Sequence, residues 1–272
     1  MDWLPESLLE MHFHRAIIKN YEKKFGAKFL RLLKPSTQKE AWVGFDQGWI
    51  KSDLPEQELF KQLSSAVSTS KTKLSKFYFG EFLQFKTVEK ITRRSSNLPS
   101  GFSTPYYRSA LSLKPNKTSH ISQHETLCRL TKIRGSSVYY ACPMIFNQDE
   151  LWNEPNLKLL RFVDVRTAPS GWLTNEQHHL AFQSPTTRVP VWCSDPVEGR
   201  AFSEEERWQS ENHPTQLSGE QVISLIDNIA EIFSNQSNEV LIQRDIFPRL
   251  VRYLPTSMCL YEFADELSIF GE

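Results

Sequence analysis

The chain has 272 residues, of which 39% are hydrophobic, 12% aromatic and 24% charged, so its composition is that of a folded globular protein and excludes a disordered chain. It contains no stretch of about 18 apolar residues, which argues against a membrane span, and its N-terminus lacks the basic and apolar regions of a signal peptide, so we expect a cytoplasmic protein. The net charge of zero divides into +11 for residues 1–140, with 23 Lys and Arg against 12 Asp and Glu, and −11 for residues 141–272, with 9 against 20.

The uneven distribution of charge bears on the kind of partner that the chain binds. A basic first half is typical of a surface that meets a polyanion. The alternative is that the two halves neutralise each other within one fold or across a dimer, because asymmetry along a sequence need not become asymmetry on a surface.

The cysteines are few and widely spaced, and no CxxC pair occurs. This spacing argues against a zinc site built from cysteines and predicts buried, reduced thiols in a reducing compartment. The four are Cys128, Cys142, Cys193 and Cys259.

Residues 5–24 are predicted to form a helix, because apolar side chains recur at helical spacing and Pro5 suits a first helical turn. Glu6, Glu10 and His14 are spaced four residues apart and therefore line one flank of this helix. The helix thus carries acidic side chains beside its apolar stripe.

Three further elements, of which at least two are strands, are expected in the next part of the chain. Residues 28–34 form a strand or a short helix, and residues 40–46 form a strand that ends at Asp46. Residues 76–88 (KFYFGEFLQFKTV) are the most strand-like run, because aromatic side chains are concentrated there.

Residues 91–120 are rich in Ser, Pro, Gly and basic residues, which predicts a long loop or flap. Its side chains suit a nucleic-acid clamp, because arginines contact phosphates and tyrosines stack on bases. The alternative is a solvated polar loop. The candidate residues are Arg93, Arg94, Tyr106, Tyr107, Arg108, Lys114 and Lys117.

The remaining elements are predicted from apolar periodicity and capping residues. They are a helix at 121–134, a buried strand at 137–146, strands at 158–166 and 179–183, and an amphipathic helix at 219–234. The acidic cluster at 204–206 is interpreted as a solvated helix start.

The chain has no Pro- or Gly-rich linker between its halves, so a single continuous domain is favoured. We expect a core in residues 1–150 and a C-terminal extension of strands and helices, residues 151–272, packed onto it.

Gln84, Phe85 and Lys86 form the pattern that points to chemistry. Residues i and i+2 of a strand share a face, so Gln84 and Lys86 reach one site while Phe85 points into the core. A lysine among apolar neighbours is costly unless a carboxylate or a metal site compensates it. Asp46 and the helix acids offer such carboxylates.

The chain resembles the PD-(D/E)XK nuclease superfamily in this order of elements: a helix with an acid, a strand with an acid, and a strand with an x-Lys motif. The segments EAWVGFDQGW and FLQFK are similar to prokaryotic members that include restriction and phage-defence enzymes. The resemblance covers roughly residues 5–146 and implies an α/β fold with a restriction-endonuclease-like αβββαβ core, a central mixed sheet flanked by helices.

The resemblance also implies roles for particular residues. Asp46 would be the central metal-ligating carboxylate, Gln84 the second ligand, and the backbone carbonyl of Phe85 a further one. Lys86 would orient or activate the attacking water, and Glu10 would be the helix-borne acid at the metal. The cation would be Mg²⁺ or Mn²⁺.

The chain departs from the family at Gln84, where an acid is usual. An amide oxygen still ligates Mg²⁺ but brings no charge. The resemblance therefore implies a metal-dependent endonuclease acting on DNA, in restriction or anti-phage defence. The alternative is a weakened nuclease fold that acts as a nucleic-acid-binding or assembly subunit.

Several further expectations remain open at this point. RNA is an alternative substrate to DNA. The alternatives for a protein partner are a second copy of this chain in a homodimer, which the opposite charges of the two halves would favour, and a protein of a defence system. His124, near the start of the predicted helix 121–134, is a candidate for contact with the scissile phosphate, and the alternative is that it caps and solvates that helix.

Overall fold

The computed structural model describes residues 4–25, 30–33, 46–52, 77–94, 98–115, 122–132, 136–169, 177–193 and 196–210. The chain divides into two compact units. The first comprises Met1–Tyr21, Leu83–Lys114 and Val138–Asn212, and the second comprises Glu22–Phe82, Pro115–Ser137 and His213–Glu272. The segments of the two units therefore alternate along the chain.

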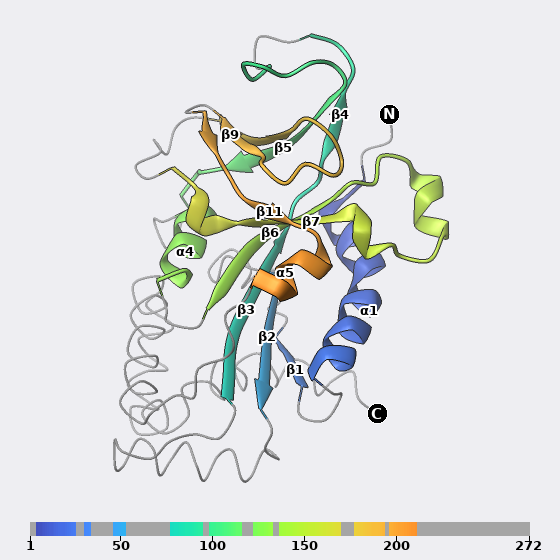
Figure 1. The fold of residues 1–272 in the computed structure, drawn as a ribbon, viewed down its shortest axis with the longest axis vertical. Helices are drawn as coiled ribbons and strands as arrows, with labels where there is room; N and C mark the ends of the chain where they lie inside the picture. Colours follow the sequence, from blue (N-terminus) through green and yellow to red (C-terminus); the bar gives the residue numbers. More distant parts are fainter. Residues whose placement is uncertain are drawn as a thin grey trace. The chain divides into compact units, whose positions relative to one another are not determined.

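The described elements are three α-helices, three short 3₁₀ helices and eleven strands (Figure 1). The helices are α1 (Glu6–Phe25), α4 (Gln123–Leu130), α5 (Glu204–Ser210), η1 (Gln148–Trp152), η2 (Leu157–Leu159) and η3 (Val165–Thr167). The strands are β1 (Leu30–Leu33), β2 (Gln47–Ser52), β3 (Phe77–Phe85), β4 (Glu89–Ile91), β5 (Tyr106–Ser112), β6 (Ser137–Pro143), β7 (Leu160–Asp164), β8 (Gln177–Phe182), β9 (Val191–Cys193), β10 (Val197–Glu198) and β11 (Ala201–Phe202).

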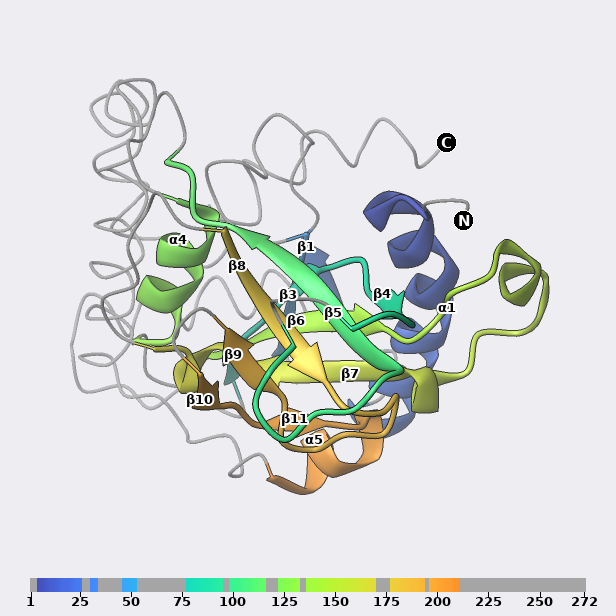
Figure 2. The same cartoon turned by 90° about the horizontal axis from the view of Figure 1, so that it is seen from above.

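The strands form two sheets, so the described fold is mixed α/β with few helices. One sheet is mixed and has the order β1-β2-β3-β6-β7-β11. The other is antiparallel, with the order β10-β9-β8-β5-β4, and its long central pair, β5 and β8, is seen side by side in Figure 2. The expectation of a mixed sheet is confirmed, and the second sheet was not foreseen.

Most elements that the sequence predicts are present with small shifts of their ends, because their apolar patterns match the faces that are buried. The confirmed elements are α1, β1, β3, α4, β6, β7, β8 and the start of α5 at the acidic cluster. The predicted helix at 219–234 and the predicted strand residues 40–45 lie outside the described residues.

The interpretation of residues 91–120 as a flap is wrong. This stretch contains β5, which pairs with β4 on one side and β8 on the other. Tyr106 and Tyr107 are buried in it. The polar composition of the stretch predicted a loop, but β5 is a strand because an interior strand is stabilised by both of its neighbours more than by its own propensity.

Asp46 lies at a bend, and β2 begins at the next residue, Gln47. The rest of the strand predicted to end at Asp46, residues 40–45, lies outside the described residues. Asp46 and Gln47 are both buried.

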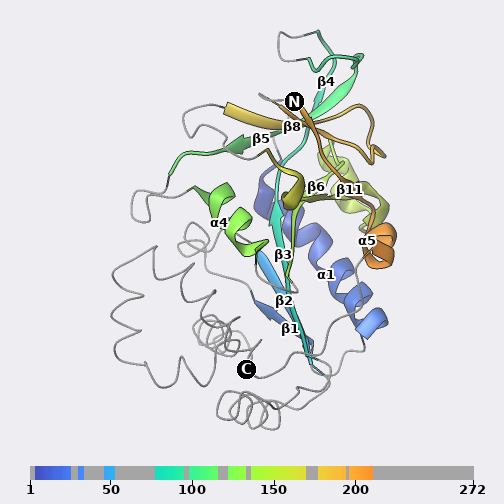
Figure 3. The ribbon, with the colours of Figure 1, turned by 60° about the vertical axis from the view of Figure 1, so that its left-hand side comes forward.

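A buried ion pair within α5 is hydrogen-bonded to α1, so it connects the first and last segments of the first unit. The Arg207 side chain is fully buried in α5, and its Nη2 donates to Glu204 Oε1 at 2.7 Å. Asn20 of α1 donates to the same oxygen at 2.6 Å. The Arg207 guanidinium also lies 4.1 Å from the centre of the Phe162 ring in β7. Figure 3 shows α5 beside β11, the strand that pairs with β7.

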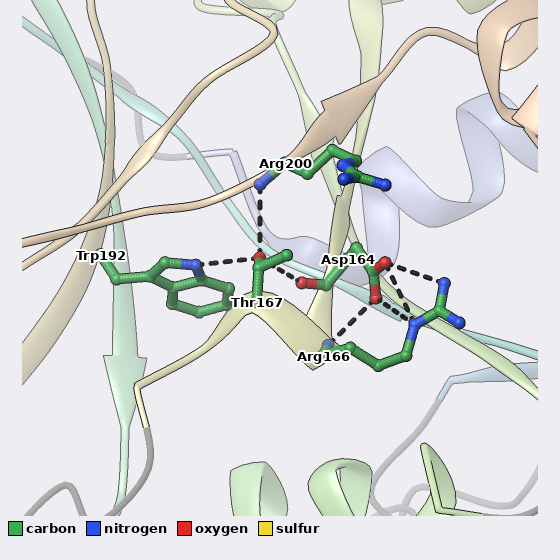
Figure 4. A network of polar contacts seen from close by, with 5 residues as sticks. All are labelled: Asp164, Arg166, Thr167, Trp192 and Arg200. Carbon is green, nitrogen blue, oxygen red and sulfur yellow. Dashed lines mark hydrogen bonds and ion pairs between the residues drawn. The ribbon is translucent and has the colours of Figure 1, made fainter.

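Thr167 ties three segments of the first unit together (Figure 4). Its hydroxyl donates to the carbonyl of Asp164 at 2.7 Å and accepts from Trp192 Nε1 at 3.2 Å and from the backbone N–H of Arg200 at 3.3 Å. Because the Trp192 ring is fully buried, this contact fixes its indole edge.

Replacing Gly199 by alanine should lower the free energy of unfolding by about 1–3 kcal/mol, the usual cost of overpacking. A Cβ at this position would lie 2.6 Å from Trp192 Nε1 and 3.2 Å from Pro190 Cγ. The buried indole has no room to withdraw. Urea unfolding measures the change. In a Trp192→Phe background the alanine should cost less, and an equal cost in both backgrounds would contradict the steric explanation.

Candidate functional site

Lys86 stands at the end of β3, and its side chain is almost buried. Its backbone N–H continues the pairing with β6 by donating to Ala141 O at 2.9 Å. Its Nζ lies 3.1 and 3.3 Å from the two carboxylate oxygens of Glu6 in α1. The Lys86 side chain is 11% exposed and that of Glu6 is 40% exposed. The cost of burying the ammonium group is therefore offset by a helix-borne carboxylate.

Glu6 is a site residue that the sequence reasoning did not select. The resemblance assigned the helix-borne acid to Glu10, one turn later, and Glu10 is buried in the structure. The signal was present, because both acids are on the flank of α1 that the four-residue spacing defines. Sequence spacing alone does not say which turn of the helix reaches Lys86.

The two ligand groups expected at Gln84 and Phe85 lie next to each other. Gln84 is almost fully buried, and its Nε2 donates to the Phe85 carbonyl at 3.2 Å. Adjacent oxygen ligands of an octahedral Mg²⁺ are about 3 Å apart when each bond is about 2.1 Å. Turning the amide by half a rotation would bring Oε1 to the position of Nε2. The spacing of this pair therefore fits a cation.

A hydrogen bond after β3 holds this strand end against the start of α1. Thr87 Oγ1 donates to the carbonyl of Leu4 at 3.3 Å, which ties the segment after β3 to the residues before α1.

Cys142 of β6 lies near Lys86 and Glu6 and is fully buried. Burial raises the pKa of its thiol, while the charge of Lys86 opposes this rise and that of Glu6 adds to it. Cys142 is therefore a neutral core residue and not a nucleophile.

Asp46, the expected central carboxylate, belongs to the second unit, whereas Gln84, Lys86 and Glu10 belong to the first. Within the described ranges, no three His, Cys, Asp or Glu side chains gather into a group that would hold a metal ion. The described part of the first unit thus provides two neighbouring oxygen atoms that suit a metal ion: Oε1 of Gln84, once its amide is turned, and the main-chain oxygen of Phe85.

The basic residues expected to contact nucleic acid have different surroundings. Arg93, Arg94 and Lys114 are exposed, and Lys117 lies outside the described residues. Arg108 pairs across the strands with Glu89 at 3.3 Å.

Tyr107 is a core residue in the structure. Its ring lies 4.9 Å from that of Phe146, with 31° between the planes, and the residue is buried. A tyrosine in this position does not present its face to a base.

His124 and Cys128 face each other on α4 of the second unit. His124 Nε2 lies 3.4 Å from Cys128 Sγ, and His124 is buried. Burial raises the pKa of Cys128 to about 11, with a further rise from Glu125 and a fall from Lys132. The thiol therefore stays protonated near neutral pH, so the pair lacks the thiolate that cysteine catalysis needs. Ser122, not His124, caps the helix, accepting from Glu125 N at 3.1 Å.

Comparison with known proteins gives no match: no family model, no curated protein and no solved structure is significantly similar to this chain.

Among the helices that the structure describes, none has the length and the apolar character needed to cross a bilayer. The described cysteines are free; Cys142 and Cys193 are buried, as the sequence predicted, whereas Cys128 is half-buried, and Cys259 lies outside the described residues.

Proposed function

We propose that the chain is a metal-dependent nuclease of the PD-(D/E)XK type that hydrolyses phosphodiester bonds in DNA. The observation that carries the proposal is the end of β3, where an amide, a main-chain carbonyl and an ammonium group follow one another and a carboxylate of α1 contacts the ammonium. The amide, the carbonyl and the ammonium are groups that the sequence resemblance implies for a nuclease centre, whereas the helix acid that it implies is Glu10 and not Glu6.

The order of the elements supports the proposal. The described chain contains α1, β1, β2, β3, α4 and β6 in the order of an αβββαβ core, with β4 and β5 between β3 and α4. The strands β1, β2, β3 and β6 are consecutive in the mixed sheet. A strand end is a rigid support, which a cation site and a catalytic lysine both require.

Each residue of this centre would have a defined task. Gln84 Oε1 and the Phe85 carbonyl would hold Mg²⁺ or Mn²⁺, which supplies Lewis-acid stabilisation of the phosphate charge. Lys86 would donate a hydrogen bond to the attacking water or to a phosphate oxygen, and Glu6 would position the Lys86 ammonium. Asp46 and Glu10 enter as ligands through the sequence resemblance alone.

The test is cleavage of plasmid and linear DNA by the purified chain with Mg²⁺ or Mn²⁺, beside the Asp46→Ala variant and a reaction with EDTA. Cutting by the wild type alone, abolished by EDTA, is the expected result. A parallel reaction with RNA decides the substrate. Absence of cutting on every substrate with either cation would overturn the proposal.

A second candidate is a nucleic-acid-binding or assembly subunit with a nuclease fold. Two contacts favour it: Gln84 presents Nε2, not oxygen, to the Phe85 carbonyl, and Lys86 is engaged by Glu6. Binding of DNA in EDTA without cleavage in Mn²⁺ would support this candidate over the nuclease.

A further inference from the structure

Three exposed arginines emerge from neighbouring segments of the first unit. Arg188 follows β8, Arg200 precedes β11, and Arg166 lies in η3. The backbone of these segments is joined: Ala201 N donates to Arg188 O at 2.7 Å, and Asp164 N donates to Arg200 O at 2.9 Å. We call Arg166, Arg188 and Arg200 the arginine cluster.

The acids that pair with the cluster are less exposed than the arginines. Arg166 Nη2 lies 2.9 Å from Asp164 Oδ2, and the two side chains are 53% and 4% exposed. Arg188 pairs with Glu206, and these side chains are 77% and 25% exposed. The guanidinium groups are therefore more exposed to solvent than the carboxylates that pair with them.

The paired acids also restrict the arginines. Asp164 accepts from both Nε and Nη2 of Arg166, so the guanidinium plane is held at two points. Figure 4 shows the side chains of Arg166 and Arg200 directed to the side of the turn on which the Asp164 carboxylate lies. A guanidinium that is already ordered loses less conformational entropy when it binds a ligand.

Buried groups support Arg188 from behind. Arg161 is buried, and its Nε donates to Pro185 O at 2.8 Å, which fixes the turn that leads to Arg188. A hydrogen bond from the Ser203 backbone lowers the pKa of Glu206, and the charges of Arg188 and Arg161 lower it further. Glu206 therefore stays ionised and keeps Arg188 in place over the neutral pH range.

We propose that the arginine cluster binds the phosphate backbone of the nucleic acid on which the chain acts. The inference rests on the proposed function and adds a surface to it, one that lies in the acidic half of the sequence. Planar guanidinium groups match phosphate oxygens in pairs. A nucleic acid is favoured over an acidic protein because its phosphates repeat regularly, so one rigid strand meets several arginines at once.

The experiment measures binding apart from cleavage. Fluorescence anisotropy of a labelled DNA duplex is recorded in EDTA, over a series of salt concentrations, for the wild type and the Arg188→Ala/Arg200→Ala variant. Each phosphate contact contributes about 0.9 to the slope of log affinity against log salt concentration, so a tenfold rise in salt lowers affinity about eightfold per contact. The double variant should lose about two contacts, and its slope should fall by about 1.8.

Matched variants separate charge from fold. Arg15→Ala removes one exposed arginine from α1 and, as the control, should change the slope by less than one contact. Arg188→Lys/Arg200→Lys keeps both charges and should keep most of the slope, which shows that the slope depends on charge at these positions. Equal urea midpoints of the wild type and the alanine variant show that the loss in the alanine variant is not unfolding. Glu205→Gln removes an exposed acid of α5 and should strengthen binding.

The outcomes distinguish this inference from the nuclease itself. If the alanine variant and Arg15→Ala bind equally well, the cluster is not a phosphate surface, whatever the cleavage assay shows. If the wild type binds no nucleic acid at 0.05 M salt, the inference is overturned too. Cleavage in Mg²⁺ that persists alongside either result leaves the nuclease proposal standing.

Discussion

DNA cleavage should fall by about 100-fold to 10,000-fold when Lys86 is replaced by alanine, the range that one positioned proton donor or acceptor contributes. The Lys86 ammonium is nearly buried and stands beside Gln84 and the Phe85 carbonyl at the strand end. Among the described contacts, Lys86 is the basic residue that pairs with Glu6. Initial rates on plasmid DNA with saturating Mn²⁺ measure the loss.

The fold should survive this substitution. The Lys86 backbone N–H keeps its bond to Ala141, and Glu6 is exposed enough to remain hydrated without its partner. The cost in unfolding free energy should therefore be about 1 kcal/mol. Lys90→Ala, a lysine of β4 in the same unit, is the matched control and should cut normally.

Glu6→Gln gives an independent check on positioning. It leaves Lys86 charged but removes the carboxylate that holds it, so the rate should fall less than in Lys86→Ala. Full activity of Lys86→Ala would sink the assignment of this lysine, and with it the assignment of β3 as the catalytic strand.

Arg207→Ala should lower the free energy of unfolding by about 3–5 kcal/mol. It leaves Glu204 buried and without the cation that Nη2 provides at 2.7 Å, and it removes a guanidinium that lies over the rings of Phe162 and Tyr21 at 4.1 and 5.5 Å. Denaturation in urea measures the change, with the slope compared to detect altered compactness.

A double replacement separates the charge from the packing. Glu204→Gln/Arg207→Met keeps the volume and removes both charges, so it should recover most of the stability that Arg207→Ala loses. Arg129→Ala removes a half-buried arginine from the i,i+4 pair with Glu125 and should cost about 0.5 kcal/mol or less. A loss below about 1 kcal/mol for Arg207→Ala would show that water reaches Glu204.

The elements that local pattern defines were predictable. The apolar spacing of α1, the aromatic run of β3 and the buried runs of β6 and β7 each match a structural period within a short window. The adjacency of Gln84, Phe85 and Lys86 is also local, because it follows from the alternation of side chains along one strand.

Long-range packing decided what the sequence did not reveal. Residues 106–112 look like a loop by composition, and they are a strand because β4 and β8 pair with them. The cluster of acids at 204–206 looks like a solvated helix start, yet Glu204 is buried because Asn20, 184 positions earlier, and Arg207 both bind it.

The sequence did not predict which acid of α1, Glu6 or Glu10, pairs with Lys86. Both acids lie on one flank of α1, so periodicity fixes the flank and nothing more. Which of them meets Lys86 depends on how far α1 slides along the end of β3, and that offset is set by tertiary contacts such as the bond from Thr87 to Leu4. The sequence by itself determined the chemical groups and their local spacing, while the tertiary structure decided which carboxylate meets the ammonium, because contacts between distant segments have no local pattern.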